Sequence, residues 1–390
     1  MRILFIVDCR IDSPGVGGAE RSLREMLPYF RKVAIEPVVA YFHRRGDEID
    51  GEEDPHFPVY TLDGLSRFEQ VRELRRVMTA EKVDLVHTTL FQADVFGRIA
   101  TAGTGLPVVT SLVNMPYEAA RLEYDRNVNR WKLAAVQLLE TATGLLFVDH
   151  FHAITQAVKD GAVRTWRVPP ERTTVVYRGR DERRLGRRTP ERTRRVRESL
   201  GVRESTFLVL NAGRQEYQKG QFVLLEAMVP LLEHEPDTLL LIAGRAGNAT
   251  AELEALLGRK RLHDRVRFLG HRTDLPDLMA AADAFALTSL WEGLGCVNIE
   301  ALALEVPIVA SDLPPVREVV ADGDSGVLFP PGDAQALARE LIRLRREPGV
   351  SERFARRGRK RFEDLFTLEK SAEGMVRIFR RLANGRAVAR

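Results

Sequence analysis

Two glutamates bracket the stretch of the chain with the clearest potential for chemistry. Glu292 follows the apolar run Ala284-Phe-Ala-Leu-Thr-Ser, and Glu300 lies eight positions later, one turn into a predicted helix. The run predicts a buried strand, and Gly293 and Gly295 allow the backbone to bend sharply and to approach a ligand closely. Amides at a helix N-terminus bind phosphate, so this stretch could hold a sugar nucleotide. The alternative is a solvated helix start with one structural glutamate.

Two cations follow an earlier predicted strand. Arg214 and Lys219 lie in Asn211-Ala-Gly-Arg-Gln-Glu-Tyr-Gln-Lys-Gly, and Lys219 opens the next helix. The forked guanidinium of arginine together with the point charge of lysine suits a diphosphate. A glycine turn into a helix, Gly17-Gly18-Ala19-Glu20, could bind an anion in the same way. The alternatives are a pair of solvated loop cations and a glycine loop that serves only close packing.

Strands and helices alternate along the chain, which predicts an α/β fold with two parallel, doubly wound sheets. Ligands of such sheets bind outside the carboxyl ends of the strands, where these cations and glutamates are placed. In the first half we expect strands at residues 3–7, 38–42, 83–87 and 107–111. In the second half we expect strands at residues 206–211, 239–243, 266–269, 284–287, 308–310 and 327–329.

Three helices have specific sequence signals. Residues 19–29 carry Leu23, Met26 and Leu27 on one face, after a glycine loop at 15–18. An acidic, proline-containing loop at 46–58 precedes a helix opened by the capping-box pair Ser66 and Glu69. We expect Phe68, Val71, Leu74 and Met78 of that helix to point inward. Near the C-terminus, Thr367 could cap a helix whose Met375, Phe379 and Leu382 form an apolar stripe.

Composition narrows the class of protein. The 390 residues are 44% hydrophobic and 29% charged, and 59 basic against 55 acidic residues give a net charge of +4. This length suggests two domains, and the mildly basic surface favours anionic ligands over nucleic acid. Cys9 and Cys296 lack the spacing of metal ligands. Two cysteines also allow no disulfide framework beyond a single bridge, which favours a reducing compartment. The N-terminal apolar run is too short for a signal sequence or a membrane span, so we expect a cytoplasmic protein.

The chain changes character between the two halves. From Arg178 to Arg197 there are ten arginines against three acidic residues. This composition predicts a linker with a solvated helix, and the alternative is a patch that faces anions or the inner face of a membrane. We therefore expect a first domain at residues 1–177, an Arg-rich linker at 178–200, a second domain at 201–366, and a C-terminal helix at 367–390 that crosses back to the first domain.

Taken together and in order, these motifs resemble the retaining glycosyltransferases of the GT-B fold, glycosyltransferase family four. The resemblance covers nearly the whole chain. It rests on Gly17 to Glu20, Gly213-Arg214 through Lys219-Gly220, Ala243-Gly244-Arg245, Phe268-Leu269-Gly270-His271, Ser289 with Glu292 to Gly295, Glu300 to Ala303, and Pro307 to Ser311. It implies two Rossmann-like domains facing a cleft, with the donor against the second domain and the acceptor against the first.

The resemblance also implies roles for individual residues. Arg214 and Lys219 match the pair that binds the donor diphosphate and stabilises the leaving nucleotide. Glu292 matches the acid that contacts the donor sugar, and Glu300 matches the acid that binds the ribose hydroxyls. The remaining residues expected at the donor are Gly17, Gly18, Gly213, Arg245, His271, Gly295, Cys296 and Val297. No metal and no cofactor is implied, because cations and amides offset the charge. Asp322-Gly-Asp324 resembles a metal-binding motif but is more typical of a turn.

The chain departs from the family pattern on the acceptor side. Where many members carry a histidine at the end of the fourth strand, this chain has Val113 followed by Asn114, and Thr89 replaces another frequent histidine. His87 and Asn114 are therefore the candidates for the acceptor contact. His150 and His152 are more typical of core or cleft-lining residues than of metal ligands. The usual Pro-Asn-Gly-Val-Asp is replaced by Tyr177-Arg-Gly-Arg-Asp.

We therefore expect a metal-independent, retaining transfer of a sugar from a nucleotide diphosphate sugar to a glycan, a lipid-linked acceptor or a small molecule. Peripheral membrane contact is a further expectation, and nucleic acid is not an expected partner, because the Arg-rich segment lacks interleaved aromatic residues. The alternatives are a nucleotide-sugar epimerase of the same fold and a degenerate member that only binds. The sequence leaves the nucleobase, the sugar and the acceptor open.

Overall fold

The computed structural model describes residues 1–12, 17–44, 57–115, 117, 119–124 and 128–387. Residues 15 and 16 of the predicted glycine loop and residues 46–56 of the acidic loop lie outside these residues. Contacts within the chain define two compact units. Unit 1 comprises Met1–Tyr117, Asn129–Gly179 and Leu368–Arg390, and unit 2 comprises Glu118–Val128 and Arg180–Thr367.

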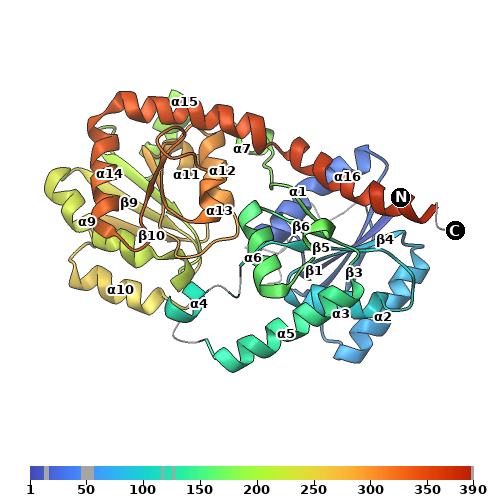
Figure 1. The fold of residues 1–390 in the computed structure, drawn as a ribbon. Helices are drawn as coiled ribbons and strands as arrows, with labels where there is room; N and C mark the ends of the chain where they lie inside the picture. The colour runs from blue at the N-terminus through green and yellow to red at the C-terminus, as the bar shows by residue number, and fades with distance from the viewer. Residues whose placement is uncertain (13–16, 45–56, 116, 118, 125–127, 388–390) are drawn as a thin grey trace. The chain divides into compact units, whose positions relative to one another are not determined.

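Unit 1 is built on a parallel sheet of seven strands in the order β3-β2-β1-β4-β5-β6-β7 (Figure 1). The strands are β1 (Arg2–Cys9), β2 (Glu36–His43), β3 (Val59–Thr61), β4 (Leu85–Thr89), β5 (Val108–Leu112), β6 (His150–Ala153) and β7 (Thr173–Val175). Ile3 of β1 is in register with Pro37 of β2 and Leu85 of β4. The chain therefore winds outward in both directions from β1, and the order reverses between β1 and β4.

Alternating residues of β1 face two separate cores in unit 1. Phe5 packs with α1 (Gly18–Lys32) and α16 (Leu368–Ala387), whereas Leu4 packs with α2 (Arg67–Ala80) and α3 (Phe91–Thr101). The two-residue period of a strand places successive side chains on opposite faces, so an uninterrupted apolar run is needed for a sheet covered on both faces. The described part of unit 1 also contains the helices α5 (Arg130–Phe147) and α6 (Gln156–Trp166) and one short 3-10 helix, η1 (Pro170–Arg172).

Helix α2 confirms one sequence prediction and corrects another. The Ser66 hydroxyl accepts a hydrogen bond from the Glu69 amide, and the Glu69 carboxylate accepts one from the Ser66 amide, so the capping box is confirmed. The prediction that Phe68 points inward is wrong, because its side chain is 76% exposed. The buried residues of α2 are Gln70, Leu74, Val77 and Met78. At 3.6 residues per turn, Phe68 lies about 130° from the centre of that buried arc.

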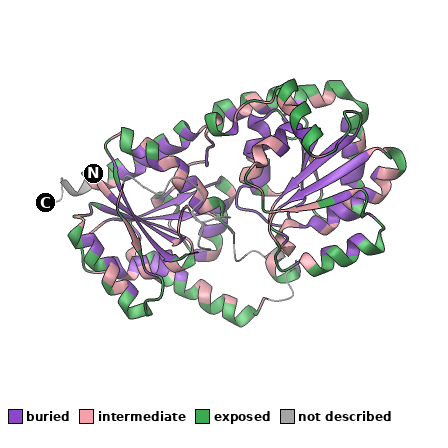
Figure 2. Ribbon diagram, turned by 180° about the vertical axis from the view of Figure 1, so that it is seen from behind, coloured by how far each residue is buried: buried purple, intermediate pink, exposed green. Residues whose placement is uncertain are grey.

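Unit 2 contains a parallel sheet of six strands in the order β10-β9-β8-β11-β12-β13. The strands are β8 (Phe207–Ala212), β9 (Thr238–Ala243), β10 (Val266–Gly270), β11 (Ala284–Leu287), β12 (Ile308–Ser311) and β13 (Val327–Phe329). The helices and turns are α4 (Ala119–Tyr124), α7 (Glu182–Leu185), α8 (Pro190–Ser199), η2 (Tyr217–Lys219), α9 (Gln221–His234), α10 (Thr250–Arg259), α11 (Leu275–Ala281), α12 (Cys296–Ala303), α13 (Pro314–Arg317), α14 (Ala334–Arg346) and α15 (Pro348–Leu365). Most strands of both sheets are buried (Figure 2). Two doubly wound parallel sheets confirm the predicted α/β class.

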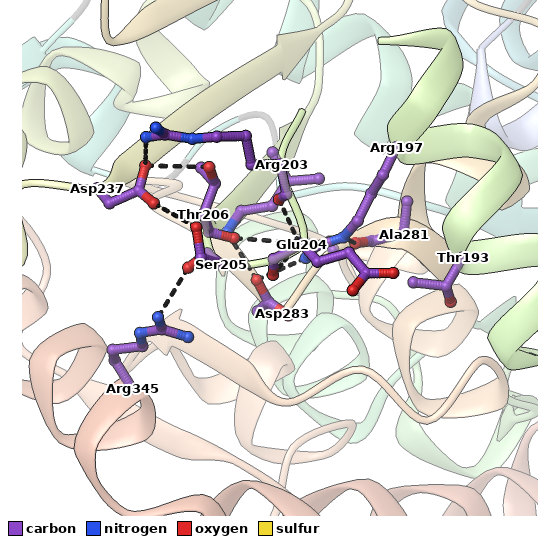
Figure 3. Close-up of polar contacts among 12 residues, drawn as sticks. Thr193, Arg197, Arg203, Glu204, Ser205, Thr206, Asp237, Ala281, Asp283 and Arg345 are labelled. Carbon is purple, nitrogen blue, oxygen red and sulfur yellow. Dashed lines mark hydrogen bonds and ion pairs between the residues drawn. The ribbon is translucent and has the colours of Figure 1, made fainter. Parts of the chain in front are cut away.

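Several arginines of the Arg-rich segment are buried, although its composition predicted exposure to solvent. Arg197 is buried and donates hydrogen bonds to the carbonyls of Ala281, Arg203, Glu204 and Thr206, while its Nη2 pairs with the Asp283 carboxylate at 2.6 Å (Figure 3). Arg178 and Arg180 are also buried, so three of the arginines in the predicted linker and solvated helix lie in the interior of the protein. A guanidinium has five donors, and backbone carbonyls at segment ends supply the acceptors that permit its burial.

The boundaries of the two units can be compared with the predicted domains. The long segment of unit 2 begins at Arg180, so residues 180–200 of the linker that we predicted at 178–200 belong to unit 2. This segment ends at Thr367, and α16 packs in the core of unit 1 through Met375 and Phe379. None of the described helices combines the length and the apolar composition needed to cross a bilayer.

Candidate functional site

The sheet of unit 2 reverses its order between β8 and β11, and the main predicted residues follow these two strands. Lys219 ends η2, beyond β8, and Glu292 follows β11. The Lys219 ammonium forms an ion pair with Glu292 Oε1, which also accepts a 2.9 Å hydrogen bond from Ser289 Oγ. The side chain of Glu292 is 8% exposed and that of Lys219 is 20% exposed. The pair therefore lies at the position where doubly wound sheets bind their ligands.

Backbone contacts fix the two loops that carry this pair. The Thr288 hydroxyl donates to the Lys219 carbonyl at 2.9 Å, and the Leu290 amide donates to the Gln218 carbonyl at 2.8 Å. Gly220 has φ of 56°, and a Cβ at this position would lie 2.2 Å from the Thr288 carbonyl oxygen. Only glycine fits here, because the loops after β8 and β11 approach each other at backbone distance.

A second close approach supports the loop that carries Arg214. A Cβ on Gly244, after β9, would lie 1.9 Å from the carbonyl oxygen of Gly213, after β8. The Gln221 amide group donates to that same carbonyl at 3.0 Å. The Arg214 guanidinium pairs with Glu216 at 2.9 Å, and half of its side chain is exposed. Arg214 and Lys219 thus lie on one loop, which is held by hydrogen bonds and close backbone contacts, and each side chain has a carboxylate partner.

The N-terminus of α12 supplies backbone donors beside this loop. Gly295, at the N-cap, has φ of 73° and no side chain caps the helix there. The first amides of the helix belong to Cys296 and Val297, which are half-buried. Asn298 is fully buried, and within the described residues neither polar atom of its side chain has a hydrogen-bond partner. A helix N-terminus attracts anions through its amides and dipole. Asn298 was not predicted from the sequence, because polar residues are common in the first turns of helices.

Glu300 is paired with a residue that the sequence did not single out. Its Oε1 accepts a 2.8 Å hydrogen bond from Arg180 Nε, and both side chains are at least 98% buried. The Arg180 amide donates to the Phe366 carbonyl at 2.9 Å, which fixes the guanidinium in place. Each charge offsets the desolvation of the other. Arg180 stands where the family pattern has valine, and the surrounding arginines concealed it.

The other predicted donor residues lie around the site or in unit 1. Arg245 follows β9 and its carbonyl accepts from the Gln215 amide at 2.9 Å, whereas His271 follows β10 and is exposed. Gly17 and Gly18 lie at the N-terminus of α1, in unit 1. Arg178 donates to the Gly18 carbonyl at 2.7 Å. The structure thus brings together Gly213, Arg214, Lys219, Glu292 and the start of α12, all within unit 2.

His87 lies in the interior of unit 1. Its ring packs 5.3 Å from Phe5 and 5.8 Å from Phe379, and it lines a cavity of about 20 Å³, room for about one water molecule. This burial gives His87 an interior position, in contrast to its expected contact with an acceptor. Asn114, which follows β5, is exposed, and its side-chain oxygen accepts from the Met115 amide at 2.8 Å.

A hydrogen-bonded chain fixes the tautomers of the two buried histidines. His152 Nε2 lies 2.9 Å from the Val176 carbonyl, which can only accept, so this nitrogen carries the proton. His152 Nδ1 then accepts from the Ser111 hydroxyl at 2.8 Å, and Ser111 accepts from His87 Nε2 at 2.7 Å. Burial lowers the pKa of His152 to about 4 and that of His87 to about 3, which agrees with two neutral rings.

Two carboxyl groups that the sequence did not reveal lie at the corresponding strand ends of unit 1. Asp8 of β1 accepts a 2.9 Å hydrogen bond from the Ala93 amide at the start of α3, and burial raises its pKa to about 7. Burial also raises the pKa of Asp94 to about 7, although the carboxylate lies 3.5 Å from Arg98. Asp8 in β1 and Asp94 in the first turn of α3 thus place two carboxyl groups of raised pKa near the point where the sheet order reverses.

Asp322-Gly-Asp324 forms a turn in which the two carboxylates have separate partners. Asp322 accepts from the Leu328 amide at 2.9 Å, and Asp324 pairs with Arg357 at 2.6 Å. Over the ranges that the structure describes, no three His, Cys, Asp or Glu side chains are grouped as metal ligands would be.

Comparisons with known proteins agree with this geometry. Residues 192–361 match the family model described as Glycosyl transferases group 1, and residues 16–184 match Glycosyltransferase Family 4. Alpha-maltose-1-phosphate synthase of Mycolicibacterium smegmatis is 27% identical, over 94% of this chain and 96% of its own length. The putative glycosyltransferase EpsD of Bacillus subtilis is 32% identical, but the match spans only 47% of this chain and 49% of EpsD. HepE of Anabaena, solved in complex with UDP and glucose, has a TM-score of 0.82 at 26% identity, over 97% of this chain and 99% of HepE.

Proposed function

Because this chain belongs to the family-four glycosyltransferases of the GT-B fold, we propose that it transfers a sugar from a nucleotide diphosphate sugar to an acceptor with retention of anomeric configuration. The observation that carries the proposal is the ion pair of Lys219 with Glu292, held between the loops after β8 and β11. The half-exposed Arg214 lies on the same loop as Lys219. Cations preorganised at a strand-end site are suited to the charge that develops on a leaving diphosphate.

In the proposed reaction, the bond from the anomeric carbon to the diphosphate oxygen breaks as the acceptor oxygen bonds to that carbon on the same face. Arg214 and Lys219 bind the diphosphate, and the amides of Cys296 and Val297 at the start of α12 add neutral donors. A diphosphate oxygen takes the proton of the acceptor, so the protein needs to supply no general base and no metal. The nucleotide diphosphate leaves with that proton.

The two glutamates divide the recognition of the donor. We assign Glu292 to the sugar, because its carboxylate shares the strand-end site with Lys219. We assign Glu300 to the ribose hydroxyls, with Arg180 holding the carboxylate in one orientation. HepE structures contain UDP and, in another crystal, UDP-glucose, which makes UDP-glucose the first donor to test.

A thermal-shift series with nucleoside diphosphates and their sugars tests donor binding directly. A ligand that binds only the folded state raises the melting temperature. At a concentration about one hundred times its Kd, such a ligand adds about 2.7 kcal/mol to the free energy of unfolding. Nucleotide release that requires an added acceptor would support a transferase. Conversion of the sugar without nucleotide release would favour an epimerase, and binding with no turnover of any donor would indicate a binding-only protein. Either of these two results would overturn the proposal.

We assign Asn114, which follows β5 and is exposed to solvent, to a hydrogen bond with the acceptor. Asn114→Ala should lower transfer at saturating donor by about tenfold, the equivalent of one hydrogen bond of about 1.4 kcal/mol, and should leave donor affinity unchanged. Val113→Ala is the matched control, because valine offers no hydrogen bond to an acceptor hydroxyl. Equal transfer by both variants would remove Asn114 from the acceptor site.

A further inference from the structure

Helix α5 of unit 1 exposes a continuous strip of apolar side chains to solvent. The exposed large side chains of the helix are Trp131, Leu138, Leu139, Leu145 and Leu146, with exposed fractions from 39% to 80%. The alanines at positions 134, 135 and 142 are exposed as well. At 3.6 residues per turn, these eight positions fall within one arc of about 140°. We call this arc the α5 apolar face.

The opposite side of α5, which carries both polar residues such as Glu140 and apolar residues such as Val136 and Phe147, is held against the rest of unit 1. The Glu140 carboxylate accepts a hydrogen bond from the Tyr117 hydroxyl, and the Glu140 carbonyl accepts one from Arg98 at 3.1 Å. The Gln137 side chain donates to the Thr165 carbonyl at 2.9 Å. A surface helix of a soluble domain normally exposes polar side chains, whereas α5 exposes a strip of large apolar ones. Polar contacts fix the helix in this orientation.

Two cations border the α5 apolar face at its N-terminal end. Arg130 and Lys132 are both exposed. On a helical wheel they lie about 100° to either side of Trp131. Long basic side chains can reach outward from the border of a membrane-inserted helix toward lipid phosphates, and tryptophan favours the interface between headgroups and acyl chains.

We propose that the α5 apolar face docks in the interface of an anionic lipid bilayer, with α5 parallel to the membrane plane. An 18-residue helix presents a strip about 27 Å long. The single acidic residue of α5, Glu140, is buried on the opposite side, so the exposed charges of this helix, on Arg130 and Lys132, are both positive. This combination of leucines, tryptophan and flanking cations is typical of helices that lie in the membrane interface. The proposal therefore places the expected membrane contact on α5 and not on the Arg-rich segment, in which Arg197 donates hydrogen bonds to protein carbonyls.

Vesicle binding by the full chain tests the proposal without donor or acceptor, so its outcome is independent of the proposed transferase activity. The protein should co-sediment with vesicles of phosphatidylcholine and phosphatidylglycerol. Trp131 should shift its emission to shorter wavelength on binding, because Trp166 and Trp291, the other two tryptophans, are buried. Trp131→Phe should abolish the shift while most of the binding persists.

Two sets of substitutions separate the apolar contribution to vesicle binding from the electrostatic one. Replacing Leu138, Leu145 and Leu146 together by Gln should weaken binding at least about a thousandfold, because burial of each leucine contributes more than a factor of ten. Arg130→Gln with Lys132→Gln should weaken binding to anionic vesicles by about 25-fold, at about fivefold per cation, and should hardly change binding to neutral vesicles. Phe68→Gln, on the exposed side of α2, is the matched control and should bind like the unmodified chain.

Three results would overturn the proposal. The unmodified chain would fail to bind anionic vesicles, or the triple leucine variant would bind as tightly as the unmodified chain. Alternatively, analytical ultracentrifugation without lipid would show a dimer that the triple variant dissociates, in which case a second copy of the chain covers the α5 apolar face. Circular dichroism and melting temperature of each variant confirm that the fold is intact, as expected for substitutions at exposed positions.

Discussion

Lys219→Met removes one positive charge from the candidate site and retains most of the aliphatic side chain. The structure predicts two separate effects. Loss of one preorganised donor to the leaving group lowers turnover about 100- to 1000-fold, or about 3–4 kcal/mol of transition-state stabilisation. Loss of the ion pair with Glu292 lowers the free energy of unfolding by about 1.5–3 kcal/mol, the usual contribution of a hydrogen bond to a charged group. The lower end applies, because Ser289 still donates to Glu292 and one fifth of Lys219 is exposed.

Glu292→Gln provides the comparison that separates stability from catalysis. It breaks the same ion pair and preserves the shape of the side chain, so the two single variants should lose similar stability. The double variant should lose less than the sum of the two, since it breaks the pair only once. Turnover is measured as nucleotide release at saturating donor, beginning with UDP-glucose, and stability by urea unfolding.

The reasoning fails if Lys219→Met retains turnover within tenfold of the unmodified chain on a donor that is shown to bind. It also fails if the whole loss of activity follows the fraction of unfolded protein. A domain stable by about 5–15 kcal/mol remains folded after a loss of 3 kcal/mol, so a large drop in turnover by folded Lys219→Met would implicate the charge itself.

Three further predictions concern the ribose, the loop geometry and pH. Glu300→Gln should weaken binding of the free nucleotide diphosphate, whereas Glu292→Gln should weaken mainly binding of the intact sugar donor; calorimetry showing equal losses for both ligands would contradict this division. Gly244→Ala should destabilise unit 2 by about 3 kcal/mol and displace the Arg214 loop, because its Cβ would overlap the Gly213 carbonyl, whereas Gly323→Ala, with open space around its Cβ, should cost only about 1 kcal/mol for its left-handed backbone. His152, whose folded pKa of about 4 lies below the ordinary value of 6.5, contributes stability that is fully present above pH 6.5 and is lost as pH falls toward 4. Between pH 6.5 and 5 the unmodified chain should therefore lose about 2 kcal/mol more than His152→Gln in urea unfolding, and parallel pH profiles would refute the neutral buried ring.

Much of the fold could be predicted because buried parallel strands have continuous apolar sequences. Residues 284–287 were predicted as a strand and form β11 with the same limits. Strand β6, His-Phe-His-Ala, was not predicted, because its two histidines interrupt the apolar pattern. Ser66 and Glu69 were predictable because a capping box depends only on residues three positions apart.

The parts of the site that escaped prediction depend on contacts between distant residues. Arg180 and Glu300 are 120 positions apart, and nothing local to either residue indicates the other. His87 was placed near the acceptor from its position at a strand end, but packing between Phe5 and Phe379 determines its burial. The apolar period of α5 resembles that of any helix in a soluble domain. Only the structure shows that this stripe faces solvent.

The division of unit 1 into three sequence segments affects the order in which the protein can fold during synthesis. Phe5 and Phe30 pack against Phe379 of α16, which belongs to the final 23 residues of the chain. The ribosome therefore completes the sequence of unit 2 before it supplies the helix that closes the core of unit 1. Until then the first segment of the chain exposes the aromatic surface that α16 will cover, and such surface is prone to aggregation and is a target for chaperones. A nonsense mutation just before the codon for Leu368, far along the chain from every residue of the candidate site, would for this reason leave unit 1 without a complete core.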